Sequence, residues 1–134
     1  MSRHRRATRV WIDQALPRLG LAHWRVTLSR APADDDAHAQ IIPQTQSYDA
    51  ELCLDSGFAK LSPERQRELL THELLHIAFA HVDAVVERLE PVIGTAAWAI
   101  FEPAYTDAAE RAIDEIARVI APSLPRIELT GGEG

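Results

Sequence analysis

The sequence predicts a single α+β domain with one small, largely antiparallel sheet of three strands. Three observations support this class. The chain has 134 residues, which is the usual size of one domain. Residues 23–55 contain three short segments in which apolar and polar side chains alternate with the period of two that strands show. The segments before and after them repeat apolar residues every three or four positions, as amphipathic helices do.

The composition is that of an ordinary globular domain, with 46% hydrophobic and 25% charged residues. No stretch approaches the roughly 18 consecutive apolar residues of a membrane span, so we expect no membrane partner. The net charge of −6 argues against nucleic acid as a partner, although Arg3, Arg5, Arg6 and Arg9 form a small basic arm. Cys53 is the single cysteine and no export signal is recognised, so we expect a cytoplasmic protein.

The first expected element is a helix from about residue 5 to 19. Val10, Ile12 and Leu16 recur at near-helical spacing, and Gly20 occupies the position of a C-terminal cap. Three strands are expected next, and the turn residues APADDD follow the first of them. Their ranges are 23–30, 37–47 and 48–55.

A long helix is expected to begin at Ser62, which can cap it, with Pro63 in the first helical position. No residue would break this helix before Pro91. The segment between Gly94 and Pro103 is compatible with a short helix or a structured loop. Residues 105–121 form the final expected helix. The proline- and glycine-containing residues 122–134 are expected to be a tail, so the predicted domain is 1–121.

Residues 71–81, THELLHIAFAH, place three histidines and a glutamate in the apolar middle of the long helix. Because a helix turns about 100° per residue, His72 and His76 project from the same face, one turn apart. Two imidazoles at this spacing can share one metal ion, and they suit zinc. Glu73 lies to the side of the pair, where it can accept a proton from an attacking water without ligating the ion. The apolar residues on both sides of the motif favour a metal site over a chance match of the motif. The expected content is one zinc ion per chain.

A hydrolytic zinc site needs a third protein ligand and one open position. His81 would point about 140° away from His76 on an unbroken helix, which argues against it. Among the acids of the final helix, Glu110 projects nearest to the apolar stripe, at about 80° from its centre. A carboxylate that borders the core is best explained by a positive partner, so Glu110 is the preferred third ligand. The alternatives that stay open are His81, Glu102, Asp107 and Asp114.

The segment LLTHELLHIAFAH, with the later E-x-x-I-x-x-I-A pattern of residues 110–117, resembles the zincin metallopeptidases in their gluzincin arrangement. The order of elements over residues 8–121 is similar to that of small metallopeptidase domains encoded in phages and prophages. The resemblance implies a zincin-like minimal domain with zinc on His72, His76 and Glu110 and with Glu73 as the general base.

The resemblance also implies that a peptide or protein substrate pairs with the edge strand nearest the motif helix, taken to be residues 48–55. The glycine and third histidine of the metzincin extension are absent, because Phe79 and Val82 stand at those positions. The distance in sequence from His76 to Glu110 is longer than in the large secreted gluzincins.

The leading prediction is therefore a zinc-dependent metallopeptidase that hydrolyses peptide bonds. Tyr105 and His81 are candidates for an oxyanion partner, although Tyr105 is explained more simply as a packing residue. A zinc-stabilised binding or regulatory module with negligible turnover is the alternative, and Glu73 argues against it because a purely structural site needs no base. A zinc-dependent RNA hydrolase rests only on the basic arm and the three-histidine spacing. The substrate and the oligomeric state stay open.

Overall fold

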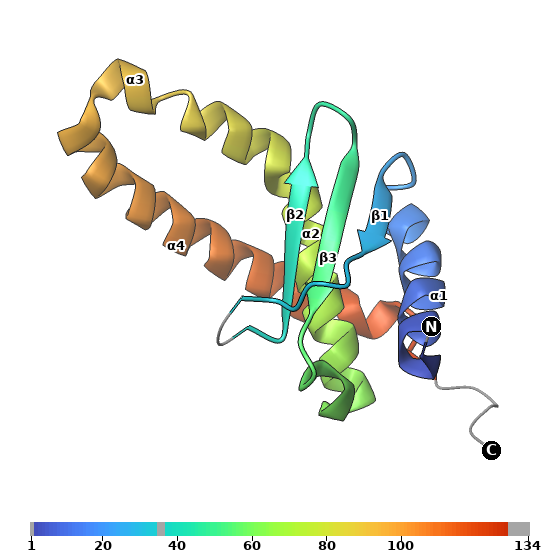
Figure 1. Cartoon of the computed structure of the whole chain (residues 1–134). Helices are drawn as coiled ribbons and strands as arrows, with labels where there is room; N and C mark the ends of the chain where they lie inside the picture. Colours follow the sequence, from blue (N-terminus) through green and yellow to red (C-terminus); the bar gives the residue numbers. More distant parts are fainter. Residues whose placement is uncertain (1, 35–36, 129–134) are drawn as a thin grey trace.

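The computed structural model describes residues 2–34 and 37–128 and has the predicted α+β architecture (Figure 1). A first helix precedes a three-stranded sheet, and two long helices joined by a short one follow it. Two single turns of 3₁₀-helix, Phe58–Lys60 and Ala121–Ser123, flank these long helices. The elements are α1 (Arg3–Arg18), β1 (Arg25–Leu28), β2 (Ala39–Gln44), β3 (Asp49–Leu54), α2 (Pro63–Glu87), α3 (Glu90–Ile93) and α4 (Thr95–Ile120).

Helix α1 packs one apolar face into the core and ends where the sequence predicts. The Ser2 side chain caps its start by accepting a hydrogen bond from the Arg5 amide at 3.1 Å. Gly20 follows the helix with a φ of +75°, a conformation that glycine adopts without strain. Trp11 and Ile12 are fully buried, so α1 covers the core rather than standing free.

The sheet has the order β1-β3-β2, with β1 parallel to β3 and β2 antiparallel to β3. It is therefore mixed, and the prediction of a mainly antiparallel sheet was wrong. The β2–β3 hairpin inserts β3 between the other two strands, so β3 runs in the direction of β1. Side-chain alternation is the same in parallel and antiparallel strands and does not reveal this order.

The same topology corrects the predicted substrate strand. Residues 48–55 contain β3, which is the central strand and has neighbours on both sides. Its backbone groups are engaged with β1 and β2, so it offers no free edge to a peptide. The edge strand that packs against α2 is β2 (Figure 1).

Helix α2 begins with the predicted cap, because the Ser62 side chain accepts a hydrogen bond from the Arg65 amide at 3.1 Å. Leu70, Leu74 and Ile77 bury one face of α2 in the core against the sheet and α1. By length and composition alone, the stretch Pro63–Ile93 would suffice to cross a membrane. In this fold, the same stretch supplies core residues to the domain.

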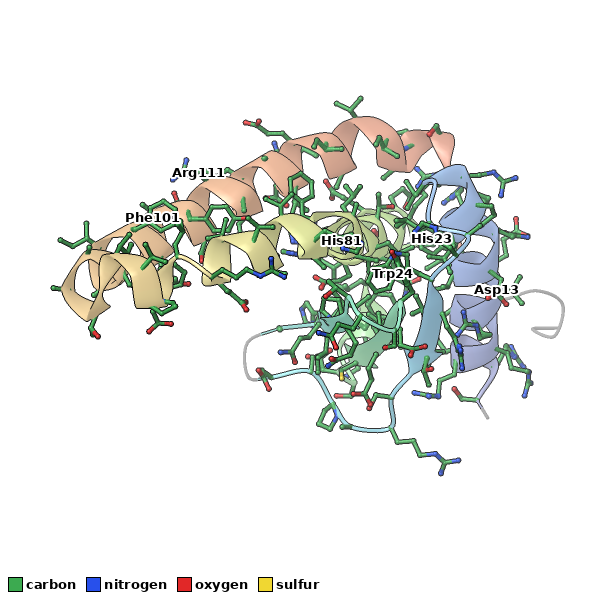
Figure 2. All side chains as sticks on the ribbon, turned by 90° about the horizontal axis from the view of Figure 1, so that it is seen from above. Asp13, His23, Trp24, His81, Phe101 and Arg111 are labelled. Carbon is green, nitrogen blue, oxygen red and sulfur yellow. The ribbon has the colours of Figure 1, made fainter. Side chains whose placement is uncertain are left out.

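Helix α4 is continuous from Thr95 to Ile120, so the segment after Gly94 is helical. Pro103 lies inside it and is exposed, and water can reach the carbonyl of Ala99 that loses its usual donor. None of residues 81–112, here called the helical arm, is buried. Figures 1 and 2 show this arm of α2, α3 and α4 extending away from the sheet and α1.

The segment after α4 returns to the core instead of leaving it. Leu124 and Ile127 are each only 5% exposed and lie in the main hydrophobic cluster. The Trp11 indole N–H donates a hydrogen bond to the Pro125 carbonyl at 2.6 Å. The core therefore extends past the predicted boundary at residue 121, while residues 129–134 of the expected tail lie outside the described residues.

Candidate metal centre

Helix α2 carries His72 and His76 on one half-buried face, as their spacing predicts. Their side chains are 15% and 25% exposed, and their ring centroids lie 4.9 Å apart. The two Nε2 atoms approach to 3.2 Å. Both imidazoles therefore direct the same ring nitrogen at one point between them.

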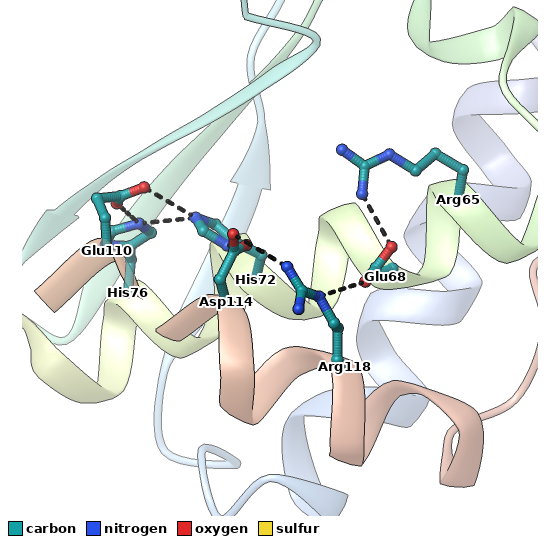
Figure 3. Close-up of polar contacts among 7 residues, drawn as sticks. All are labelled: Arg65, Glu68, His72, His76, Glu110, Asp114 and Arg118. Atoms are coloured by element: carbon teal, nitrogen blue, oxygen red, sulfur yellow. Dashed lines mark hydrogen bonds and ion pairs between the residues drawn. The ribbon is translucent and has the colours of Figure 1, made fainter. Parts of the chain in front are cut away.

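Glu110 of α4 completes this cluster (Figure 3). Its Oε1 lies 2.6 Å from His76 Nε2 and its Oε2 lies 3.4 Å from His72 Nε2. One ligand atom from each of the three residues lies within 4.8 Å of the others. Ile113 of α4 is fully buried and packs with Leu75 of α2, which holds this part of α4 in place. The structure thus brings together the three residues that were predicted as ligands.

The spacing of the two imidazole nitrogens is that of neighbouring ligands of a tetrahedral zinc ion. Zinc–nitrogen and zinc–oxygen bonds of about 2.0 to 2.1 Å place ligand atoms about 3.3 Å apart in a tetrahedron. The 3.2 Å between the two Nε2 atoms is close to this value. The two oxygens of Glu110 lie at different distances, with Oε2 3.4 Å from His72 Nε2 and Oε1 2.6 Å from His76 Nε2. A donor set of two imidazoles and a carboxylate suits zinc.

Asp114 fixes the orientation of His72. Its Oδ1 lies 3.0 Å from His72 Nδ1, so Nε2 is the nitrogen left for the cluster. Asp114 also approaches Arg118 at 3.9 Å, and Arg118 approaches Glu68 at the same distance (Figure 3). The sequence analysis considered Asp114 only as an alternative ligand. The signal for its actual position is its spacing of four residues from Glu110, one turn along the helix.

Burial has opposite effects on the two titratable groups beside the cluster. It raises the pKa of Glu73 from 4.5 to about 8, the charge of Glu110 adds to this rise, and a backbone hydrogen bond from Ile41 opposes it. Burial also lowers the pKa of His76, although the charge of Glu110 acts against this. His76 is therefore held in the neutral form that a metal ligand needs.

The cluster opens onto a groove of about 480 Å³ between β2, α2 and α4. The His38 carbonyl accepts a hydrogen bond from the Asp55 amide at 3.0 Å, which marks a hydrogen-bonded pair between the two strands. Because such pairs alternate, Ala39, Ile41 and Pro43 turn their backbone groups away from β3. These three residues also line the groove. The other lining residues are Asp34, Ala37, Gln40, His72, Glu73, His76, Asp83 and Glu110.

No family model, curated protein or solved structure matches this chain. The resemblance to the zincins consequently rests on the motif and on the geometry of the residues above. Membership of the zincins stays a prediction.

The remaining candidates lie outside the cluster. The ring of His81 contacts those of Trp24 and Tyr48, with centroids 5.9 and 5.7 Å away. The Tyr105 hydroxyl donates to Asp83 at 2.5 Å, and burial, with this hydrogen bond, raises the pKa of Tyr105 to about 12. Asp107 pairs with Arg111 and Glu102 accepts a hydrogen bond from Thr106.

A larger hollow of about 870 Å³ lies between α1 and residues 125–128. Its lining includes Arg3, Arg6 and Arg18 but none of the clustered histidines and carboxylates. Hydrolysis requires the clustered histidines and carboxylates, and these line the smaller groove. We therefore take the smaller groove as the candidate site.

Proposed function

We propose that this protein is a zinc-dependent metallopeptidase. The observation that carries the proposal is the convergence of His72, His76 and Glu110, from two separate helices, at the wall of an open groove. A zinc ion held by these three residues would polarise a peptide carbonyl and lower the pKa of a water molecule. One position of a tetrahedral ion would stay open for this chemistry.

Glu73 is suited to the role of general base. It lies on α2 next to His72 and lines the groove, but it does not belong to the cluster of His72, His76 and Glu110. Its carboxylate can take the proton from the attacking water and pass it to the leaving amine. Because the charge of Glu110 contributes to its raised pKa, a cation beside Glu110 would favour the ionised form that a base requires.

The edge of β2 is suited to hold the substrate. An extended peptide can pair as an added strand with the backbone of Ala39 and with the carbonyl of Ile41, which face the groove. The Ile41 N–H already donates a hydrogen bond to Glu73. Pro43 has no N–H, so it contributes only an acceptor at that end of the strand. This assignment replaces residues 48–55 as the proposed substrate strand and keeps a peptide or protein as the proposed substrate.

The composition of the groove favours a peptidase over an RNA hydrolase. Asp34, Asp83, Glu73 and Glu110 line it, and no arginine or lysine does so among the described residues. Carboxylates repel the phosphate groups of RNA, whose binding depends on cationic side chains. The groove therefore suits a peptide better than a polyanion.

The test is cleavage of a peptide library by the zinc-loaded protein, in parallel with zinc content. Glu73→Gln is expected to keep its zinc and to lose at least about 100-fold in cleavage rate, because general-base catalysis contributes 10²- to 10⁴-fold. Glu115→Gln is the matched control, since Glu115 is exposed on α4 outside the groove. Zinc binding without any cleavage by the wild type would favour the binding or regulatory module instead.

A further inference from the structure

The helical arm carries apolar side chains that the other residues described by the structure leave partly exposed. Val82, Val85 and Leu89 near the end of α2, and Phe101 on α4, leave between 37% and 61% of their surface exposed. A soluble domain normally avoids such a contiguous patch unless it serves a contact. Figure 2 shows Phe101 on the part of α4 that lies far from the sheet and α1.

These side chains belong to two regular stripes. One stripe consists of positions 78, 82 and 85 on α2 and position 89 in the turn that follows it, here together called the α2 stripe. On α4 the stripe consists of positions 97, 101, 104 and 108. Both follow the alternating spacing of four and three residues that keeps side chains on one face of a helix. The α2 stripe is Ala78, Val82, Val85 and Leu89, and the α4 stripe is Ala97, Phe101, Ala104 and Ala108.

Both stripes lie on the same side of the arm. The inner faces of α2 and α4 are marked by the hydrogen bond between Asp83 and Tyr105. At about 100° per residue, the first stripe lies about 130° from Asp83 and the second about 70° from Tyr105. Because the two helices run in opposite directions, these two rotations bring the stripes to one common side, here called the arm face. By the same count, Glu73 and Glu110 project to the opposite side.

The arm face carries no charge and is complementary to itself. None of its eight positions is Asp, Glu, Lys or Arg. Its α2 stripe holds mainly branched side chains, whereas three of the four residues of its α4 stripe are alanines. A twofold axis parallel to the arm would place the bulky stripe of one copy on the small stripe of the other, as in the packing of helix bundles.

We infer that the arm face binds a second copy of this chain, so that two arms form a four-helix bundle. The eight side chains expose on the order of 500 Å² in each chain, and two copies would bury about 1,000 Å², the size at which specific interfaces begin. The absence of charge removes the repulsion that a self-contact of this acidic protein would otherwise meet. The metal-centre groove stays open in this dimer, because it faces the other way.

The test is the mass in solution by sedimentation or light scattering at about 50 µM protein, a range in which interfaces of this size associate. We expect the wild type at twice 14.9 kDa. Val85→Glu and Ala104→Glu each put a charge into the interface, and both are expected at 14.9 kDa with a dissociation constant raised at least about 100-fold. Ile100→Glu is the matched control and should stay dimeric, because Ile100 is 80% exposed on α4 outside the stripe.

The double change Val85→Glu with Ala104→Lys tests the arrangement of the stripes. If the bulky stripe of one copy faces the small stripe of the other, the opposite charges meet across the interface and the dimer returns. Circular dichroism of every variant must match the wild type, which separates loss of association from loss of fold. A monomeric wild type, or dimers that survive both single glutamate substitutions, would overturn the inference.

Discussion

Replacing Glu73 by glutamine is expected to stabilise the metal-free protein at alkaline pH and to leave its stability unchanged at acid pH. The pKa of Glu73 is raised from 4.5 to about 8, first by burial and then by the charge of Glu110. A carboxyl group whose pKa is higher in the folded state favours folding when it is protonated. The folded state therefore loses stability as the pH rises from 4.5 to about 8.

The size of this effect follows from the interval between the two pKa values. Each pKa unit corresponds to about 1.4 kcal/mol, so the interval from 4.5 to about 8 corresponds to roughly 5 kcal/mol. Glutamine has nearly the same shape and no charge to bury. Glu73→Gln should thus match the wild type near pH 4.5 and exceed its unfolding free energy by roughly 3 to 5 kcal/mol at pH 8.5.

Urea unfolding of both proteins in the presence of a chelator, at intervals between pH 4.5 and 9, measures this difference. The lowered pKa of His76 acts in the opposite direction, but it is common to both proteins and cancels in the comparison. Two curves that run parallel over the whole range would refute the reasoning, because Glu73 would then titrate alike in the folded and unfolded chains.

Three further predictions concern other parts of the structure. Asp114→Asn should weaken zinc binding about 10- to 100-fold in a chelator competition assay, with Glu115→Gln as the control, because Asp114 orients His72. Leu124→Ala should cost about 2 to 4 kcal/mol of unfolding free energy in urea, whereas a flexible tail would show almost no change. Ser62→Ala should cost about 1 kcal/mol in the same assay, since it removes the cap of α2.

Local signals in the sequence predicted the start of α2 and the end of α1, whereas α2 ends at Glu87 before Pro91 and α4 begins at Thr95 rather than at the predicted residue 105. Ser62 and Pro63 mark the start of α2, and Gly20 marks the end of α1, because capping depends on residues within one turn of each other. The position of His72 and His76 on one face of α2 also follows from helical spacing alone. The position of Glu110 was accessible because a carboxylate that borders an apolar stripe needs a partner, although binding of a metal stays a prediction.

The errors concern contacts between distant segments. The parallel pairing of β1 with β3 is decided by which strand inserts between the others, and no residue within either strand records it. Pro103 is tolerated in α4 because that turn is exposed, a property that appears only once the fold is known. Leu124 and Ile127 belong to a segment that contains Pro122 and Pro125 and is therefore expected to be a tail, yet both pack in the core beside residues of α1 and α2.

The central claim is that His72, His76 and Glu110 hold one zinc ion. Elemental analysis of the wild type, His76→Ala, Glu110→Ala and Glu115→Gln after supply of zinc tests it most directly. The account predicts one zinc per chain in the wild type and in Glu115→Gln, and its loss in the other two variants. A wild type without zinc, or zinc that persists in both His76→Ala and Glu110→Ala, would contradict it.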